Sequence, residues 1–312
     1  MKTAFLFSGQ GAQYIGMGKE LYDRYEEVRE TFTKASEILD YDMAKLCFEE
    51  NDQLNLTVYT QPAILTTSVA FYRILQNKGL LPDAVMGLSL GEYSALVAAE
   101  VLDFQTALKI VHQRGQLMTQ AAPPGTGKMV AVMNTPIDII EECCQKASTL
   151  GIVAPANYNT PQQIVIGGEV KAVDLAMEYL KENNVKRMIP LNVSGPFHTA
   201  LLASASQGLK QIFAKVTFNQ PKIPVISNTT AQVMEAANIA SLLEKQVMSP
   251  VRFYESIATL KELKVERVVE VGPGKVLSGF VKKIDKSIQI SRVEDEQTLN
   301  ETLTILGGNN GN

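Results

Sequence analysis

Residues 84–99 read AVMGLSLGEYSALVAA, and this stretch decides the fold of the chain. Its apolar start predicts a short buried strand, and its alanine-rich end predicts a helix. Between them, Gly87-x-Ser89-x-Gly91 predicts a sharp strand-to-helix turn, because the two glycines leave space where Cβ atoms would collide. Such a turn is a nucleophile elbow, with the Ser89 hydroxyl at its tip and a helix N-terminus behind it that favours negative charge. The alternative interpretation is an ordinary Gly/Ser turn of an α/β sheet.

The composition excludes several classes of protein. Of the 312 residues, 46% are hydrophobic, which is ample for a large core. The net charge of −4, with both signs interspersed, gives no basic surface for nucleic acid. We find neither a transmembrane run nor an export signal, so we expect a cytoplasmic protein with no membrane contact. The three cysteines, Cys47, Cys143 and Cys144, show neither a disulfide framework nor metal-ligand spacing, so we expect no metal.

The first part of the chain predicts a parallel sheet covered by helices. An apolar strand at residues 3–7 ends in the glycine turn of residues 8–13, which is not a dinucleotide fingerprint because Tyr14 stands at the third glycine position. Thr60-Gln61-Pro62 predicts a capped helix start, with the helix continuing to Gly79. Residues 104–122 predict another helix, and residues 223–226 a later strand that ends at Ser227-Asn228.

Residues 127–191 predict a different order of strands and helices. They predict strands at 129–133, 152–158, 162–166 and 186–191 and helices at 137–147 and 170–182. This βαββαβ order is the ferredoxin-like arrangement. We therefore predict an α/β hydrolase-like main domain, discontinuous at 1–126 and 192–306, with a ferredoxin-like subdomain inserted at 127–191 and a disordered tail at 307–312. A cleft between such parts is a common place for a small-molecule site.

Only two histidines are available as a base for Ser89. His198 lies in a loop before a predicted helix and follows the serine in the chain, as the base does in α/β enzymes with a serine elbow. A structural histidine is the alternative. His112 has Lys109 and Gln116 as helical neighbours, which indicates a surface position.

Arg114 lies on the same predicted helix as His112 but on a different face. Ile110 and Leu117 flank it at helical spacing, so its guanidinium is expected to need an anionic partner inside the protein. That partner is either a carboxylate of the scaffold or a substrate, and spacing alone does not separate the two.

Taken together, these motifs resemble those of malonyl-CoA:acyl carrier protein transacylases, the acyltransferase family of fatty-acid and polyketide synthesis. The resemblance covers nearly the whole chain. Matching segments occur in the family's order: Gly9-Gln10-Gly11-Ala12-Gln13, Tyr59-Thr60-Gln61-Pro62-Ala63, Gly87-Leu88-Ser89-Leu90-Gly91-Glu92, Arg114-Gly115, Asn157-Tyr158-Asn159, Gly195-Pro196-Phe197-His198, Gln246 with Pro250-Val251-Arg252, and Glu270-Val271-Gly272-Pro273-Gly274. Leu88 stands where the family most often has histidine, and Ser8 where it often has proline.

The resemblance implies a set of roles. Malonyl-CoA would be the substrate, acyl carrier protein the partner, and no cofactor would be bound. The implied residues are Ser89 as nucleophile, His198 as base, the Gln246 carbonyl as the group that orients His198, the N–H groups of Gln10 and Leu90 as oxyanion hole, Arg114 as ligand of the malonyl carboxylate, and Gln61, Asn157 and Asn159 near the pocket. Phe197 before His198 resembles the malonyl-selective members.

Three alternatives stay open for the function. A thioesterase or esterase would use the same serine and histidine without an internal arginine facing the acyl group. A trans-acting acyltransferase of polyketide synthesis would share every motif. A catalytically silent binding module is opposed by the presence of both Ser89 and His198. We expect a monomer.

Overall fold

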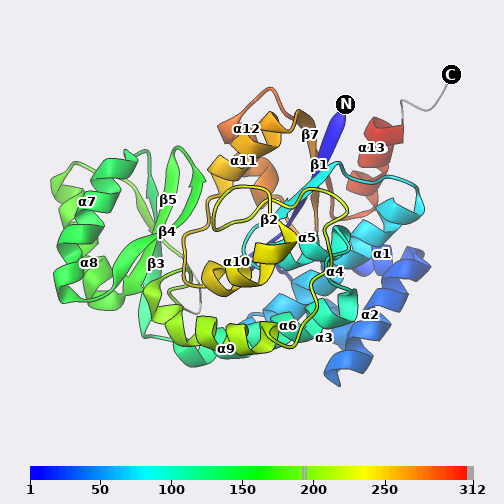
Figure 1. Ribbon diagram of the computed structural model, residues 1–312, viewed down its shortest axis with the longest axis horizontal. Coiled ribbons are helices and arrows are strands. Elements are labelled where there is room, and N and C mark those ends of the chain that lie inside the picture. Colours follow the sequence, from blue (N-terminus) through cyan, green and yellow to red (C-terminus); the bar gives the residue numbers. More distant parts are fainter. Residues whose placement is uncertain (192, 194, 308–312) are drawn as a thin grey trace.

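The computed structural model describes residues 1–191, 193 and 195–307. Four parallel strands form the sheet of its larger part, in the order β2-β1-β7-β8 (Figure 1). Their bounds are β1 Lys2–Phe7, β2 Ala84–Gly87, β7 Val265–Val271 and β8 Gln289–Val293. Residues of β1 alternate between two cores, since Phe5 and Phe7 pack on one side and Ala4 and Leu6 on the other. A sheet covered on both faces explains why β1 and β2 are apolar runs.

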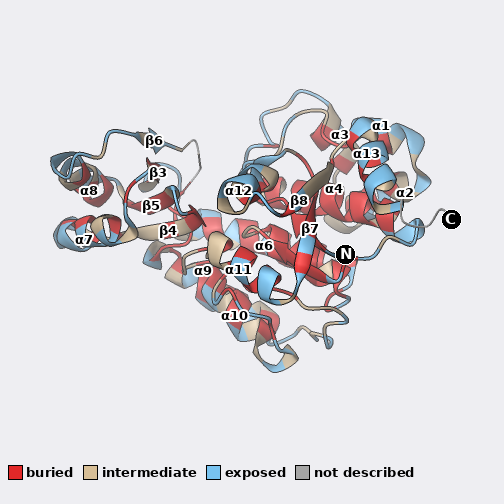
Figure 2. Ribbon diagram, turned by 90° about the horizontal axis from the view of Figure 1, so that it is seen from above, coloured by how far each residue is buried: buried red, intermediate tan, exposed pale blue. Residues whose placement is uncertain are grey.

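Helices cover both faces of this parallel sheet. α4 is mostly buried and α6 is buried along one face, and the core that they share extends to Phe5 and Phe7, whereas α11 and α12 cover the opposite face (Figure 2). The helices of this part are α1 Lys19–Arg24, α2 Glu26–Leu39, α3 Met43–Phe48, α4 Thr57–Asn77, α5 Gly91–Ala98, α6 Phe104–Ala121, α9 Ala203–Phe213, α10 Ile239–Gln246, α11 Phe253–Glu262, α12 Val276–Ile284 and α13 Glu296–Gly307. In the part of the chain that the structure describes, no helix has both the length and the apolar character to cross a membrane.

A second, antiparallel sheet forms the smaller part, in the order β4-β5-β3-β6. Its strands are β3 Gly127–Met133, β4 Val153–Thr160, β5 Gln163–Glu169 and β6 Met188–Pro190, and its helices are α7 Ile137–Ala147 and α8 Val170–Glu182. Val130 and Val132 pack with α7 and α8, whereas Met129 and Ala131 face the larger core. The predicted fold class, a parallel-sheet α/β part with a βαββαβ unit, is therefore confirmed, and the domain boundaries stay predictions.

Three sequence predictions were wrong in detail. α4 begins at Thr57 rather than at Thr60, because the Thr60 hydroxyl donates to the carbonyls of Leu54 and Leu56 instead of capping N–H groups. Residues 223–226 form no regular strand but only two isolated bridges, from Val225 to Val85 and from Ile226 to Val233, since Pro224 has no N–H to donate. Gly307, predicted as the first residue of a disordered tail, ends α13 instead; residues 308–312 lie outside the described residues.

Candidate active site

Two glycines without room for a side chain and the hydrogen bonds of one asparagine fix the elbow around Ser89. A Cβ on Gly87 would lie 2.0 Å from the Gly91 carbonyl carbon, and a Cβ on Gly91 would lie 2.1 Å from the Phe7 oxygen, so neither position tolerates a side chain. Ser89 has a left-handed backbone with φ 53°. The Asn228 side chain spans the turn, accepting from the Ser89 N–H at 2.6 Å and donating to the Gly87 carbonyl at 2.6 Å. The predicted strand-turn-helix is therefore confirmed.

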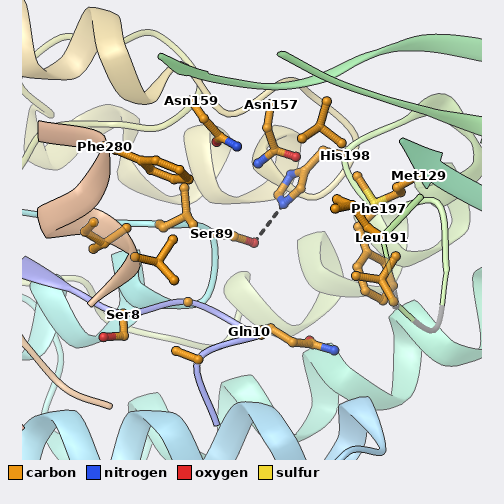
Figure 3. Close-up of a pocket in the computed structure, with 18 of the residues that line it drawn as sticks. Ser8, Gln10, Ser89, Met129, Asn157, Asn159, Leu191, Phe197, His198 and Phe280 are labelled. Carbon is orange, nitrogen blue, oxygen red and sulfur yellow. Dashed lines mark hydrogen bonds between the residues drawn. The ribbon is translucent and has the colours of Figure 1, made fainter. Parts of the chain in front are cut away.

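His198 meets Ser89 across 109 residues of sequence (Figure 3). Its Nε2 lies 2.8 Å from Ser89 Oγ, and its Nδ1 lies 2.9 Å from the Gln246 carbonyl oxygen. Because a carbonyl can only accept, Nδ1 carries the proton and Nε2 is free to accept from the serine. Burial and then the charge of Arg114 lower the pKa of His198 to about 4, so the ring is neutral near pH 7. Like Ser89, His198 has a left-handed backbone, with φ 60°.

The other histidine is placed where the sequence predicted it. His112 is only half-buried on α6, and its Nε2 lies 3.3 Å from the amide nitrogen of Gln116. Of the two histidines, only His198 contacts the serine hydroxyl.

Arg114 is 1% exposed and points its guanidinium at the serine. It donates to Gln61 Oε1 at 2.8 Å, to Gln246 Oε1 at 2.9 Å and to Ser89 Oγ at 3.1 Å. Its Nε has no hydrogen-bond partner among the described residues. No ion pair joins it to a carboxylate within that part of the chain, so the scaffold salt bridge that we had considered is absent there. A buried cation held by neutral oxygens can still bind an anion.

Glu92 and the Gln246 side chain complete the network around Arg114. The Gln246 amide nitrogen donates to Glu92 Oε2 at 2.6 Å and to the Ser89 carbonyl at 2.8 Å. Burial raises the pKa of Glu92 to about 7, although the Asn228 N–H, the Gln246 amide and Arg114 favour its ionised form. We did not predict a role for Glu92 or Asn228 from the sequence, where they appear only as the end of the elbow motif and the end of a presumed strand.

A pocket of about 330 Å³ opens onto Ser89 and His198 between the two sheets. Asn157 and Asn159 reach it from β4, and Phe197 lines it beside His198 (Figure 3). The Oδ1 of Asn159 is buried without a partner in the described part of the chain, whereas its Nδ2 donates to Gln163. Further apolar walls, which the sequence did not identify, come from Met118, Met129, Val165, Leu191 and Phe280.

The predicted oxyanion-hole residues flank Ser89. Gln10 lines the pocket, and a Cβ on Gly9 would lie 2.4 Å from the Leu88 oxygen, so the glycine turn after β1 packs directly on the elbow. The backbone N–H groups of Gln10 and Leu90 have no acceptor among the described residues, which leaves both free for a ligand oxygen.

The two departures from the family pattern are accommodated by packing. Leu88 packs beside the core of Ala4 and Leu6 and lines the pocket with an apolar surface. The buried Ser8 hydroxyl donates to the Pro273 carbonyl at 2.9 Å, which ties the turn after β1 to the loop after β7. Neither residue contacts the dyad through a hydrogen bond in the described structure.

Metal ligation finds no support in the side chains that the structure describes. They include no group of three or more His, Cys, Asp and Glu residues able to hold a metal ion. All three cysteines are buried and free.

An elbow serine paired with a neutral, carbonyl-oriented histidine is the arrangement of serine acyltransferases and serine hydrolases, which form an acyl-serine intermediate. The chain belongs to the acyl transferase domain family, whose model matches residues 4–301. It is 44% identical over 314 aligned residues to the malonyl CoA-acyl carrier protein transacylase of Bacillus subtilis, covering 100% of this chain and 99% of the relative.

Solved structures agree with this assignment. The crystal structure of MCAT from Streptococcus pneumoniae superposes with a TM-score of 0.95 at 58% identity and covers 97% of this chain and 100% of that one. A malonyl-transacylase in complex with its type II PKS acyl-carrier protein also superposes with a TM-score of 0.95, at 38% identity, covering 99% of this chain and 100% of that one. The family predicted from the sequence motifs is thus confirmed.

Proposed function

We propose that the chain transfers a malonyl group from malonyl-CoA to the phosphopantetheine thiol of an acyl carrier protein for fatty-acid synthesis, with no bound cofactor. The observation that carries the proposal is the position of Arg114, a buried cation 3.1 Å from the Ser89 hydroxyl. Full-length similarity to malonyl transacylases supports the same substrate. A plain esterase would have no use for a cation at this distance from its nucleophile.

In the first half-reaction Ser89 Oγ attacks the thioester carbonyl while His198 Nε2 takes its proton. The N–H groups of Gln10 and Leu90 donate to the oxyanion. The C–S bond then breaks, and the CoA sulfur leaves with the proton that His198 returns. The product is malonyl-Ser89.

The second half-reaction runs the same steps in reverse with a new thiol. The carrier thiol gives its proton to His198 and attacks malonyl-Ser89, and the ester C–O bond breaks as the proton returns to Ser89 Oγ. Because the two thioesters share one site, the kinetics are ping-pong. The apolar walls formed by Met129, Leu191 and Phe280 would limit water at the acyl-enzyme.

Arg114 would anchor the free carboxylate during both halves. The malonyl carboxylate lies only two carbons from the reacting carbonyl, so a cation beside the nucleophile fits a short dicarboxylic acyl group. Gln61 supports this cation rather than the substrate, since its Oε1 accepts from Arg114. Asn157 and Asn159, at the pocket wall, would contact amide and carbonyl groups of the substrate, either in its pantetheine arm or in its acyl group.

The direct test is the intact mass of the protein after mixing with malonyl-CoA. We expect a gain of one malonyl group, lost again when a phosphopantetheinylated carrier protein is added. Stable malonylation with no transfer to any carrier protein would contradict the transferase proposal, and release as free malonate would favour a thioesterase. Transfer only to polyketide carrier proteins would favour the trans-acting acyltransferase. Since CoA thioesters and carrier proteins are cytoplasmic, we propose that location for the enzyme.

A further inference from the structure

Glu92 is a buried carboxylate that the proposed chemistry does not use. It lies in the first turn of α5, three residues after Ser89, and is 0% exposed. Its Oε1 accepts from the Asn228 N–H at 2.6 Å, and its Oε2 accepts from the Gln246 amide nitrogen at 2.6 Å. Both oxygens therefore have a donor without a direct ion pair to the nearby Arg114. Burying a charged carboxylate costs free energy of desolvation, so a carboxylate kept beside the nucleophile is a candidate for a role in the site.

The Gln246 amide between Glu92 and Arg114 can lie in only one direction. A carboxylate only accepts and a guanidinium only donates, so the amide nitrogen must face Glu92 and the amide oxygen must face Arg114. The observed distances, 2.6 Å on the carboxylate side and 2.9 Å on the guanidinium side, follow this arrangement. With the amide turned around, a nitrogen donor would face the guanidinium donor, and Arg114 would lose one of its two amide acceptors.

This arrangement also keeps the positive charge of Arg114 available. Gln61 and Gln246 hold the guanidinium through neutral oxygens at 2.8 and 2.9 Å. A direct pair with Glu92 would orient the guanidinium equally well but would compensate its charge, and a substrate carboxylate would then have to compete with the internal one. The Gln246 amide between the two ions lets Glu92 orient the guanidinium of Arg114 without pairing with it. The positive charge of Arg114 therefore stays available to a substrate carboxylate.

We propose that Glu92 is a positioning residue that, through the Gln246 amide, fixes the Arg114 guanidinium beside Ser89 and so maintains selectivity for a malonyl over an acetyl group. This inference rests on the proposed malonyl transfer. It assigns Glu92 no contact with the substrate and no proton transfer.

The test is the isosteric variant Glu92→Gln, assayed at about pH 8, where the native carboxylate is ionised. A glutamine has one acceptor oxygen for the two donors of Asn228 and Gln246, so its own nitrogen must face one of them. We expect kcat/KM for malonyl-CoA to fall about 10- to 100-fold, the effect of losing one hydrogen bond to a charged group, with a much smaller change for acetyl-CoA. A malonyl-to-acetyl ratio within about twofold of the wild-type ratio would overturn the proposal.

Glu294→Gln is a control for the loss of a half-buried carboxylate away from the nucleophile, which, unlike Glu92, pairs with an arginine, Arg292. Oε1 of Glu294 accepts from the Tyr14 hydroxyl and from the Gly274 N–H, and within the described part of the chain no hydrogen bond joins Glu294 to Arg114 or Gln246. We expect its ratio to match the wild type. An equal fall of the ratio in both variants would mean that any lost carboxylate produces the effect, which would also overturn the proposal.

Gln246→Met keeps the inference testable if Glu92→Gln does not fold. Methionine removes the amide but preserves the backbone carbonyl that accepts from His198. The ratio should fall as in Glu92→Gln, and in the double variant the two losses should not add, because both break the same connection. An unchanged ratio in Gln246→Met would refute the connection. A wild-type chain that acquires no malonyl group contradicts the proposed function itself, whereas an unchanged ratio in active variants contradicts only the role of Glu92.

Discussion

Replacing Arg114 by alanine should separate malonyl from acetyl transfer. The native guanidinium is buried and lies 3.1 Å from the nucleophile oxygen. A malonyl group differs from an acetyl group by one carboxylate, which this cation can bind in a water-poor pocket. The variant removes that anchor and leaves Ser89 and His198 in place.

The expected size follows from the energy of a hydrogen bond to a charged group. Such a bond contributes about 1.5–3 kcal/mol, so malonyl transfer should fall by about ten- to a hundredfold or more. Acetyl-CoA has no carboxylate to lose and no longer meets an unpaired cation, so its transfer should stay equal or improve. The variant should also be less stable, by about 1–3 kcal/mol for each of the Gln61 and Gln246 oxygens left without a donor.

The assay is kcat/KM for both thioesters in the wild type and in Arg114→Ala, at a temperature well below the melting point of the variant. Urea denaturation measures the loss of stability separately. If both rates fall together and the ratio is constant, Arg114 is a structural residue, and malonyl selectivity must come from other groups in the pocket.

Four further results are expected. Ser89→Ala should abolish malonylation in intact-mass spectra while circular dichroism stays unchanged, and an adduct on this variant would contradict the nucleophile assignment. His198→Ala should lose about 10²–10⁴-fold in rate, whereas His112→Ala should keep most of the activity; equal losses would contradict these roles. Because the folded pKa of His198 is lowered to about 4, protonation should not inactivate this base until the pH approaches that value, so kcat/KM should show no loss from this group near pH 6.5. Asn228→Ala should lower the free energy of unfolding by about 1–3 kcal/mol for each unsatisfied group at the elbow, measured by urea denaturation.

Local sequence was sufficient for the elbow and for both parts of the fold. A Cβ on Gly87 would collide with Gly91 four residues further on, so that exclusion is local, whereas the exclusion at Gly91 comes from the Phe7 carbonyl at the end of β1. Hydrophobic periodicity gave the βαββαβ unit with helix bounds that match α7 and α8. The start of α4 was missed because Pro62 indicates a first turn, whereas in the structure Pro62 lies inside the helix.

The supports of the site could not be predicted from local patterns. Asn228 contacts the Ser89 N–H across 139 residues, and Gln246 contacts Glu92 across 154. An asparagine after a short apolar run or a glutamate in a first helical turn has ordinary local explanations, such as capping. Their roles depend on which donors and acceptors the fold brings together, and that pairing is a property of the tertiary structure.

The left-handed backbone at Ser89 and His198 has an evolutionary consequence. Each of these positive φ angles, 53° and 60°, costs a side-chain-bearing residue free energy that glycine would not pay, about 1–3 kcal/mol for such strained positions. Glycine at either position would relieve the backbone but remove the reacting hydroxyl or the imidazole. Selection for turnover and selection for thermal tolerance therefore oppose each other at these two residues, and stabilising substitutions in this lineage must accumulate elsewhere in the chain.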